Sequence, residues 1–154
     1  IAYLVPDWFE WFRQSGDPRL RGYETAMCEL GLEPEYIIVS DEKREGVAAS
    51  LSAYLERHGC PDGIFCYNDD LAIGAFATLR GKGLRIPEDA ALIGCDGIRE
   101  TAYLTPPITT IVQPLQQMCS TAWTLLHQRI KNPEIPLQQV VLAPRLELRG
   151  SSLR

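Results

Sequence analysis

The stretch from Asp62 to Pro114 reads DGIFCYNDDLAIGAFATLRGKGLRIPEDAALIGCDGIRETAYLTPPITTIVQP. An apolar run over residues 63–67 breaks at Asn68 into polar residues and then a helical pattern. A second apolar run, residues 90–94, breaks at Cys95-Asp96-Gly97. Continuous apolar runs are typical of buried strands in a parallel sheet, and open α/β sheets bind ligands where such strands end. Asn68 and Asp96 are therefore the first candidates for a ligand site.

The same alternation of strand and helix extends on both sides of this stretch. Extended segments are predicted at residues 1–5, 36–39, 64–67, 91–94 and 108–112, with helices between the first four. Asp17 is predicted to cap a helix with Pro18 at its first position, and Ser40 or Asp41 to cap the next. Repeated βαβ units require a parallel sheet with right-handed crossovers. The predicted fold class is thus α/β: a parallel sheet with helices on both faces, forming a Rossmann-like lobe.

The C-terminal part of the chain has a different pattern. Residues 115–130 are predicted to be helical, and residues 139–142 and 145–148 to be short extended pieces. This helix and these strands carry an apolar face but have no sequential partner strands. We therefore expect them to pack on another part of the protein or on a partner chain, or to remain mobile.

Composition limits the functional classes. The chain has 154 residues and a formal net charge of −5, about one domain's length without the basic surface that nucleic-acid binding favours. No apolar run approaches the roughly 18–20 residues of a membrane span, and no basic-then-apolar leader is present. The five cysteines form no C-x-x-C pair, which is typical of a reducing compartment. The predicted location is the cytoplasm, with no membrane contact.

Several motifs resemble one known family. They are N-D-D-x-A-I-G-A at residues 68–75, L-R-x-x-G-x-x-I-P-x-D at 79–89, I-G-x-D-G at 93–97 and P-P-I-T-T-I-x-Q-P at 106–114. In this order they are similar to the effector-binding domain of the lactose-repressor/galactose-repressor family, a class I periplasmic-binding-protein-like fold. Residues 1–4 and 19–27 also fit, so the resemblance covers nearly the whole chain apart from residues 6–14 and 41–46.

The resemblance implies a domain organisation. Such effector-binding domains have two βαβ lobes joined by three crossings. Residues 1–110 resemble the C-terminal lobe, and residues 111–154 resemble the crossover plus the helix and strands that belong to the N-terminal lobe. Most of that lobe, and a DNA-reading helix-turn-helix, would lie upstream of the present sequence. The family also forms homodimers, with the helix beginning near Asp70 and the loop 99–104 as the expected dimer surface.

Candidate ligand residues follow from chemistry and from this resemblance. The carboxylate of Asp96 can accept hydrogen bonds from two vicinal sugar hydroxyls, whereas a loop aspartate bonded to its own backbone is the alternative. Asn68 offers a donor and an acceptor, but it can also cap the helix that follows. Arg19 resembles the family's effector-holding arginine, although alone it could be a solvated surface residue. Asp69 is expected to be a helix cap or a structural hydrogen-bond hub.

Other family contacts are matched less closely. Gln113 lies at the predicted crossing, where relatives contact the effector or sense closure. Arg13 and Ser15 match pocket-lining positions of purine-binding relatives. The position where relatives place a stacking aromatic is Asp41 here, so either the effector differs or one of four nearby aromatics replaces the platform. These aromatics are Trp8, Phe9, Trp11 and Phe12.

Enzyme readings find little support. His58 and His127 have no partner at triad or metal-ligand spacing, and no G-x-S-x-G, P-loop or H-E-x-x-H motif occurs. We therefore predict no catalysis, no metal and no cofactor. The predicted function is the sugar-effector-binding domain of a DNA-binding transcription regulator. The alternative is a periplasmic sugar-binding transport receptor of the same architecture.

Overall fold

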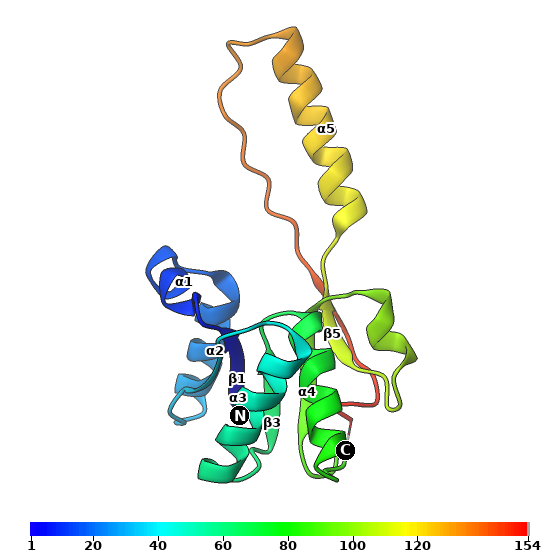
Figure 1. The fold of residues 1–154 in the computed structure, drawn as a ribbon. Helices are drawn as coiled ribbons and strands as arrows, with labels where there is room; N and C mark the ends of the chain where they lie inside the picture. The colour runs from blue at the N-terminus through cyan, green and yellow to red at the C-terminus, as the bar shows by residue number, and fades with distance from the viewer. Residues whose placement is uncertain (154) are drawn as a thin grey trace.

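A six-stranded sheet organises the computed structural model of the chain, which describes residues 1–153, with the backbone alone for Phe12 and Ser15 (Figure 1). The strand order is β2-β1-β3-β4-β5-β6. Strands β1 to β5 pair in parallel, and β6 pairs antiparallel with β5. The strands are β1 (Ala2–Pro6), β2 (Glu35–Val39), β3 (Gly63–Cys66), β4 (Ala91–Asp96), β5 (Thr109–Val112) and β6 (Arg145–Glu147).

Helices cover both faces of this sheet, as predicted. On one face, Tyr23 of α2 (Pro18–Glu29) packs its ring 5.0 Å from that of Tyr3. On the other face, α4 (Asp69–Gly81) approaches so closely that a Cβ on Gly94 would lie 3.2 Å from the Ala72 side chain. Helix α3 (Arg44–His58) packs beside α4 and over β2. The α/β fold class predicted from the sequence is confirmed.

The helix ends show where local prediction succeeded and failed. Asp17 caps α2, accepting from the backbone N–H of Arg19 at 2.8 Å, with Pro18 at the first position, as predicted. The predicted cap of α3 by Ser40 or Asp41 is wrong. Lys43 occupies the cap position, and the Asp41 carboxylate instead accepts from the Lys43 N–H at 3.1 Å within the loop. A short helix α1 (Phe9–Ser15) was not predicted.

The C-terminal part divides into two pieces. Helix α5 (Leu115–Lys131) and residues 132–144 project away from the sheet, and no residue of α5 is buried (Figure 1). Residues 139–142, predicted to be extended strand, form no strand. The assignment of residues 145–148 to the other lobe is corrected, because β6 pairs with β5 of this sheet. Ser151 then inserts between strands, donating from its hydroxyl to the carbonyl oxygen of Leu92 at 2.5 Å.

The pairing of β6 with β5 has a physical cause. In the described residues, β5 has no other partner on its outer side, and β6 pairs with the backbone groups exposed there.

Between residues 1 and 153, no helix is long and apolar enough to cross a membrane.

Candidate functional site

The carboxyl ends of β3, β4 and β5 bring three predicted site residues to one edge of the sheet. Asn68 follows β3, Asp96 ends β4, and Gln113 follows β5. The register pairs Phe65 with Ile93 and Asp96 with Val112, so these polar side chains occupy neighbouring positions along the edge. Local apolar runs and parallel pairing are sufficient to produce this arrangement.

Asp96 has a strained backbone and a partly committed side chain. Its φ is 127°, a region that non-glycine residues rarely adopt. Its Oδ1 accepts from Nε2 of Gln113 at 2.5 Å. Within the described part of the chain, Oδ2 has no hydrogen-bond partner. Burial raises the pKa of this carboxyl, and the Gln113 hydrogen bond and the charge of Arg19 act in the opposite direction. The structure therefore presents a half-buried carboxylate with one oxygen free to accept hydroxyl donors.

Asp69 is the hub that holds this loop, as the sequence predicted. It is 1% exposed, and its carboxylate accepts three short hydrogen bonds. The donors are the backbone N–H of Gly97 at 2.7 Å, the N–H of Ile98 at 2.8 Å and the Thr110 hydroxyl at 2.7 Å. A single buried carboxylate thus ties β3, the loop after β4 and β5 together, and its role is structural.

Asn68 performs the capping role that the sequence left open. Its Oδ1 accepts from the backbone N–H of Leu71 at 2.8 Å at the start of α4. The amide nitrogen is not used by the cap. Asn68 is half-buried at the same edge as Asp96. A ligand contact by Asn68 therefore remains a prediction, and its side-chain amide nitrogen is the group that would make it.

Arg19 is not a solvated surface residue. Its guanidinium lies 3.7 Å from the ring centroid of Tyr67 and donates both to the backbone oxygen of Tyr67 at 3.3 Å and to the Tyr67 hydroxyl. It also donates to both carboxylate oxygens of Asp17, at 3.4 and 3.2 Å. This pair lowers the pKa of Asp17 despite its burial and raises that of Arg19. The sequence predicted Asp17 only as a helix cap, and no spacing in the sequence indicated that Tyr67 would contact Arg19.

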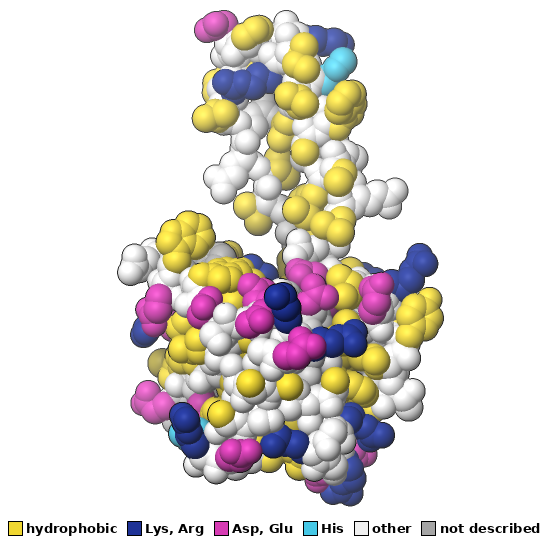
Figure 2. Space-filling view, in the orientation of Figure 1, with side chains coloured by type: hydrophobic (Ala, Val, Ile, Leu, Met, Phe, Trp, Pro, Cys, Tyr) yellow, Lys and Arg dark blue, Asp and Glu magenta, His cyan; other side chains and the backbone are white. Residues whose placement is uncertain are grey.

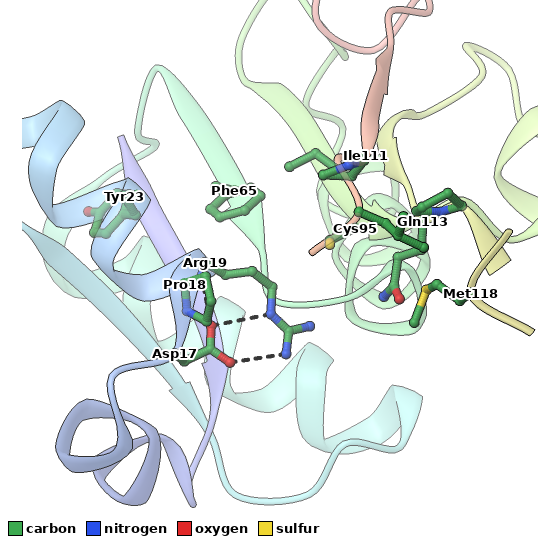
Figure 3. Close-up of a pocket in the computed structure, with 13 residues that line it drawn as sticks. Asp17, Pro18, Arg19, Tyr23, Phe65, Cys95, Ile111, Gln113 and Met118 are labelled. Atoms are coloured by element: carbon green, nitrogen blue, oxygen red, sulfur yellow. Dashed lines mark hydrogen bonds and ion pairs between the residues drawn. The ribbon is translucent and has the colours of Figure 1, made fainter. Parts of the chain in front are cut away.

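A cavity of about 520 Å³ opens beside this row of residues. Asp17, Arg19 and Tyr23 lie on one side, with Cys95, Gln113 and other residues across from them (Figure 3). Arg19 and Gln113 line the cavity, but Asn68 and Asp96 do not. Met118, Leu142 and Pro144 of the projecting segment also line it, so the cavity lies between the sheet edge and that segment.

Two predicted residues are not brought into this group. Arg13 is exposed in the last turn of α1. Burial and a hydrogen bond to Glu24 raise the pKa of Tyr36 in β2, and the charge of Arg13 opposes that shift. The Ser15 side chain lies outside the described part of the chain. Both remain predictions from the resemblance alone.

Four aromatic residues were candidates to replace the family's stacking aromatic, and of these Trp8 lies beside Tyr67, at the sheet edge that carries the predicted site. Its ring packs edge-on to Tyr67 at 5.3 Å, its Nε1 donates to Glu42 at 2.8 Å, and it is 39% exposed. Phe9 is a core residue, 5% exposed and 4.9 Å from the Tyr36 ring. Trp11 is 66% exposed on α1. The Phe12 side chain is outside the described part of the chain.

Comparison with known proteins agrees with this geometry. Residues 1–152 match the family of periplasmic binding protein-like domains. The chain is 38% identical over 135 residues to the ribose operon repressor of Haemophilus influenzae, covering 86% of this chain and 41% of that protein. It is 36% identical over 141 residues to the HTH-type transcriptional repressor PurR of Escherichia coli O1:K1, covering 90% of this chain and 41% of that protein.

Solved structures give the same result. A LacI family transcriptional regulator from Arthrobacter sp. FB24, in complex with lactose, superposes with a TM-score of 0.83 at 30% identity, covering 99% of this chain and 57% of that one. A regulator of the same family from Enterococcus faecium, with bound ribose, has a TM-score of 0.81 at 28% identity, covering 98% of this chain and 55% of that one.

The fold and the site define a periplasmic-binding-protein-like domain. The chain belongs to this family. The two solved structures that it resembles are LacI family transcriptional regulators. The relatives are transcriptional repressors and not enzymes. The chain spans 41% of the length of these two curated relatives.

Proposed function

We propose that this chain is part of the effector-binding domain of a cytoplasmic DNA-binding regulator, and that its effector is a sugar. The observation that carries the proposal is the Asp96 carboxylate, which is held at the sheet edge by Gln113 with Oδ2 free of partners in the described residues. A half-buried carboxylate with a free oxygen suits vicinal hydroxyls. Arg19 and the amide of Asn68 complete the polar edge.

The relatives support a sugar rather than another small molecule. The two regulators described above are bound to lactose and ribose, respectively. That the curated relatives are repressors also favours a regulator over a transport receptor.

The proposed mechanism is closure of two lobes on the effector. Residues 1–112 and 145–153 form the lobe described above, and residues 113–142 belong to a second lobe in the intact protein. The two described crossings, at Gln113 and Pro144, both border the cavity. Effector that contacts both lobes favours the closed state, and closure shifts the population between DNA-competent and incompetent forms.

Operator binding would occur through a helix-turn-helix outside this chain and through a homodimer. A two-fold dimer matches palindromic operators. The dimer surface is assigned to α4 and the short helix η1 (Arg99–Tyr103), where Tyr103 is 77% exposed. This assignment rests on the family resemblance and on that exposure.

Calorimetric titration of the intact protein with neutral sugars tests the site. We expect binding by the wild type and a loss of at least about tenfold in affinity for Asp96→Ala, since a carboxylate that accepts hydroxyl hydrogen bonds contributes about 1.5–3 kcal/mol. Asp70→Ala, at an exposed carboxylate of the same edge, is the matched control. Equal affinity in the wild type and Asp96→Ala would reject the site, and loss of operator response without loss of binding would reject the closure mechanism only.

A further inference from the structure

Arg19 is paired with Asp17 beside the proposed sugar site. We infer that Asp17 makes the site selective for uncharged sugars over acidic or phosphorylated ones, because it neutralises Arg19 and occupies its donors. This inference rests on the proposed function and specifies the ligand class.

The donor inventory of Arg19 supports this inference. A guanidinium has five N–H donors in a fixed fork. Four hydrogen bonds from Arg19 stay within the protein: to Oδ1 and Oδ2 of Asp17, to the backbone oxygen of Tyr67 and to the Tyr67 hydroxyl. A ligand carboxylate or phosphate is gripped best by two parallel N–H groups of an arginine. To offer such a pair, Arg19 would have to break contacts that it already makes.

The charges around the sheet edge that carries Asp96 also favour an uncharged ligand. The Asp17–Arg19 ion pair contributes no net charge, and its two side chains are only 6% and 28% exposed. Asp96 then remains as a half-buried carboxylate close enough to Asp69 and Asp70 to feel their charges. Arg13, another cation of this lobe, is exposed on α1, and its charge acts on Tyr36. A second anion at this edge would meet negative potential, whereas a hydroxyl would meet acceptors.

The rings beside Arg19 suit an uncharged ring ligand. Tyr67 lies under the guanidinium and edge-on to Trp8, whose indole nitrogen is oriented by Glu42. The apolar face of a sugar ring can pack on such aromatic surface, while its hydroxyls reach polar groups.

Helix capping alone does not require an aspartate at this position. Asn and Ser cap helices about as well as Asp. Asp17→Asn therefore keeps an acceptor for the Arg19 backbone N–H and removes the charge that neutralises the guanidinium. Asp17→Ser gives a second neutral cap, so that the test does not depend on the folding of one variant.

The experiment is calorimetric titration of the intact protein with pairs of sugars that differ in charge. The pairs are glucose with glucuronate, galactose with galacturonate, and ribose with ribose 5-phosphate. Because placing like charges together costs several kcal/mol, we expect the wild type to bind the neutral member of its best pair at least about tenfold more tightly. In Asp17→Asn and Asp17→Ser this ratio should shrink by about tenfold, since a freed Arg19 charge attracts the acid.

Two controls separate the possible failures. Asp70→Asn removes one exposed carboxylate from the same edge, and an equal shift in the ratio there would overturn the role of the Asp17–Arg19 pair. A wild type that binds both members equally, or an unchanged ratio in both Asp17 variants, would also overturn the inference while leaving the proposed function intact. If no member of any pair binds, or if Asp96→Ala binds with the affinity of the wild type, the proposed function fails and the inference fails with it.

Discussion

Asp69 links the sheet to the loop that carries Asp96. Its carboxylate holds two backbone N–H groups and the Thr110 hydroxyl while 99% of its surface is covered, as its 1% exposure shows. Asp69→Asn replaces one acceptor oxygen by a donor that faces other donors. We expect the free energy of unfolding to fall by about 3 kcal/mol, measured by urea denaturation. Its exposed neighbour gives the comparison: Asp70→Asn should change stability by less than about 0.5 kcal/mol. Similar small losses in both variants would refute the hub role.

Asp96 should make effector binding depend on pH. Burial raises the pKa of its carboxyl above the ordinary 3.8, so protonation occurs at higher pH than for an exposed aspartate. Sugar affinity should fall as pH drops through this raised pKa, because the protonated carboxyl loses acceptor strength. The contribution of Asp96 to folding stability has the opposite sign: it is present at low pH and lost as pH rises through the same pKa. Dissociation constants measured from neutral pH down through the raised pKa of Asp96 test the prediction. In Asp96→Asn, any binding that remains should no longer depend on pH through this group.

The Tyr3 hydroxyl has an unusual environment. Tyr3 is 0% exposed, and its hydroxyl has no hydrogen-bond partner among the described residues. Burial strongly raises its pKa. Tyr3→Phe removes an unsatisfied polar atom and keeps the ring that stacks 4.7 Å from Phe65, so we expect stability to rise by about 1 kcal/mol. A loss of stability on chemical denaturation would show that the hydroxyl has a partner, such as a bound water.

At the scale of elements, the contact between α3 and α4 depends on a glycine. A Cβ on Gly74 would lie 3.0 Å from a methyl carbon of Val47, tighter than ordinary contacts. Gly74→Ala should therefore destabilise the protein by about 1–3 kcal/mol, as overpacked cores do. Gly22, in α2, has nothing within 4 Å of the same added atom. Gly22→Ala should raise stability by about 0.4–1 kcal/mol. Thermal unfolding of both variants checks the pair, and equal effects would contradict the packing argument.

The elements that local sequence pattern predicted are those whose apolar spacing is strong. Val47, Leu51 and Tyr54 of α3 are all buried, as their spacing indicated. Helix α1 was missed because its bulky residues do not lie on one face: Phe9 is buried, whereas Trp11 is exposed. Their spacing in the sequence therefore shows no clear helical period. Strand β6 was misplaced because its position depends on long-range pairing with β5, which no local pattern encodes. The apolar runs predicted the strand ends that carry Asp96 and Gln113 to one edge of the sheet. The contacts of Arg19 with Asp17 and Tyr67 depend on side-chain directions that only the fold fixes.

In the whole molecule, the projecting segment carries many exposed apolar side chains. Hydrophobic side chains gather along α5 and the residues after it (Figure 2). In α5, Leu115, Met118, Trp123, Leu126 and Ile130 are all more than 40% exposed. Surfaces of this kind mark interaction sites. Such exposure agrees with the proposal that residues 113–142 pack on a second lobe.

A single substitution tests that proposal in the intact protein. Trp123 is 67% exposed in this chain, and Leu30, at the far end of α2, is 66% exposed. If the second lobe covers Trp123, then Trp123→Ala should lower the stability of the intact protein by about 3 kcal/mol, as for other buried tryptophans. Leu30→Ala should change it by less than about 0.5 kcal/mol. Equally small effects would mean that α5 remains uncovered.

The most direct test of the central claim is a crystal structure of the intact protein with a neutral sugar that it binds. We predict sugar hydroxyls within about 2.5–3.0 Å of the Asp96 carboxylate, with Arg19 still paired to Asp17. A sugar bound away from the edge formed by Asn68, Asp96 and Gln113, with no contact to Asp96, would contradict it.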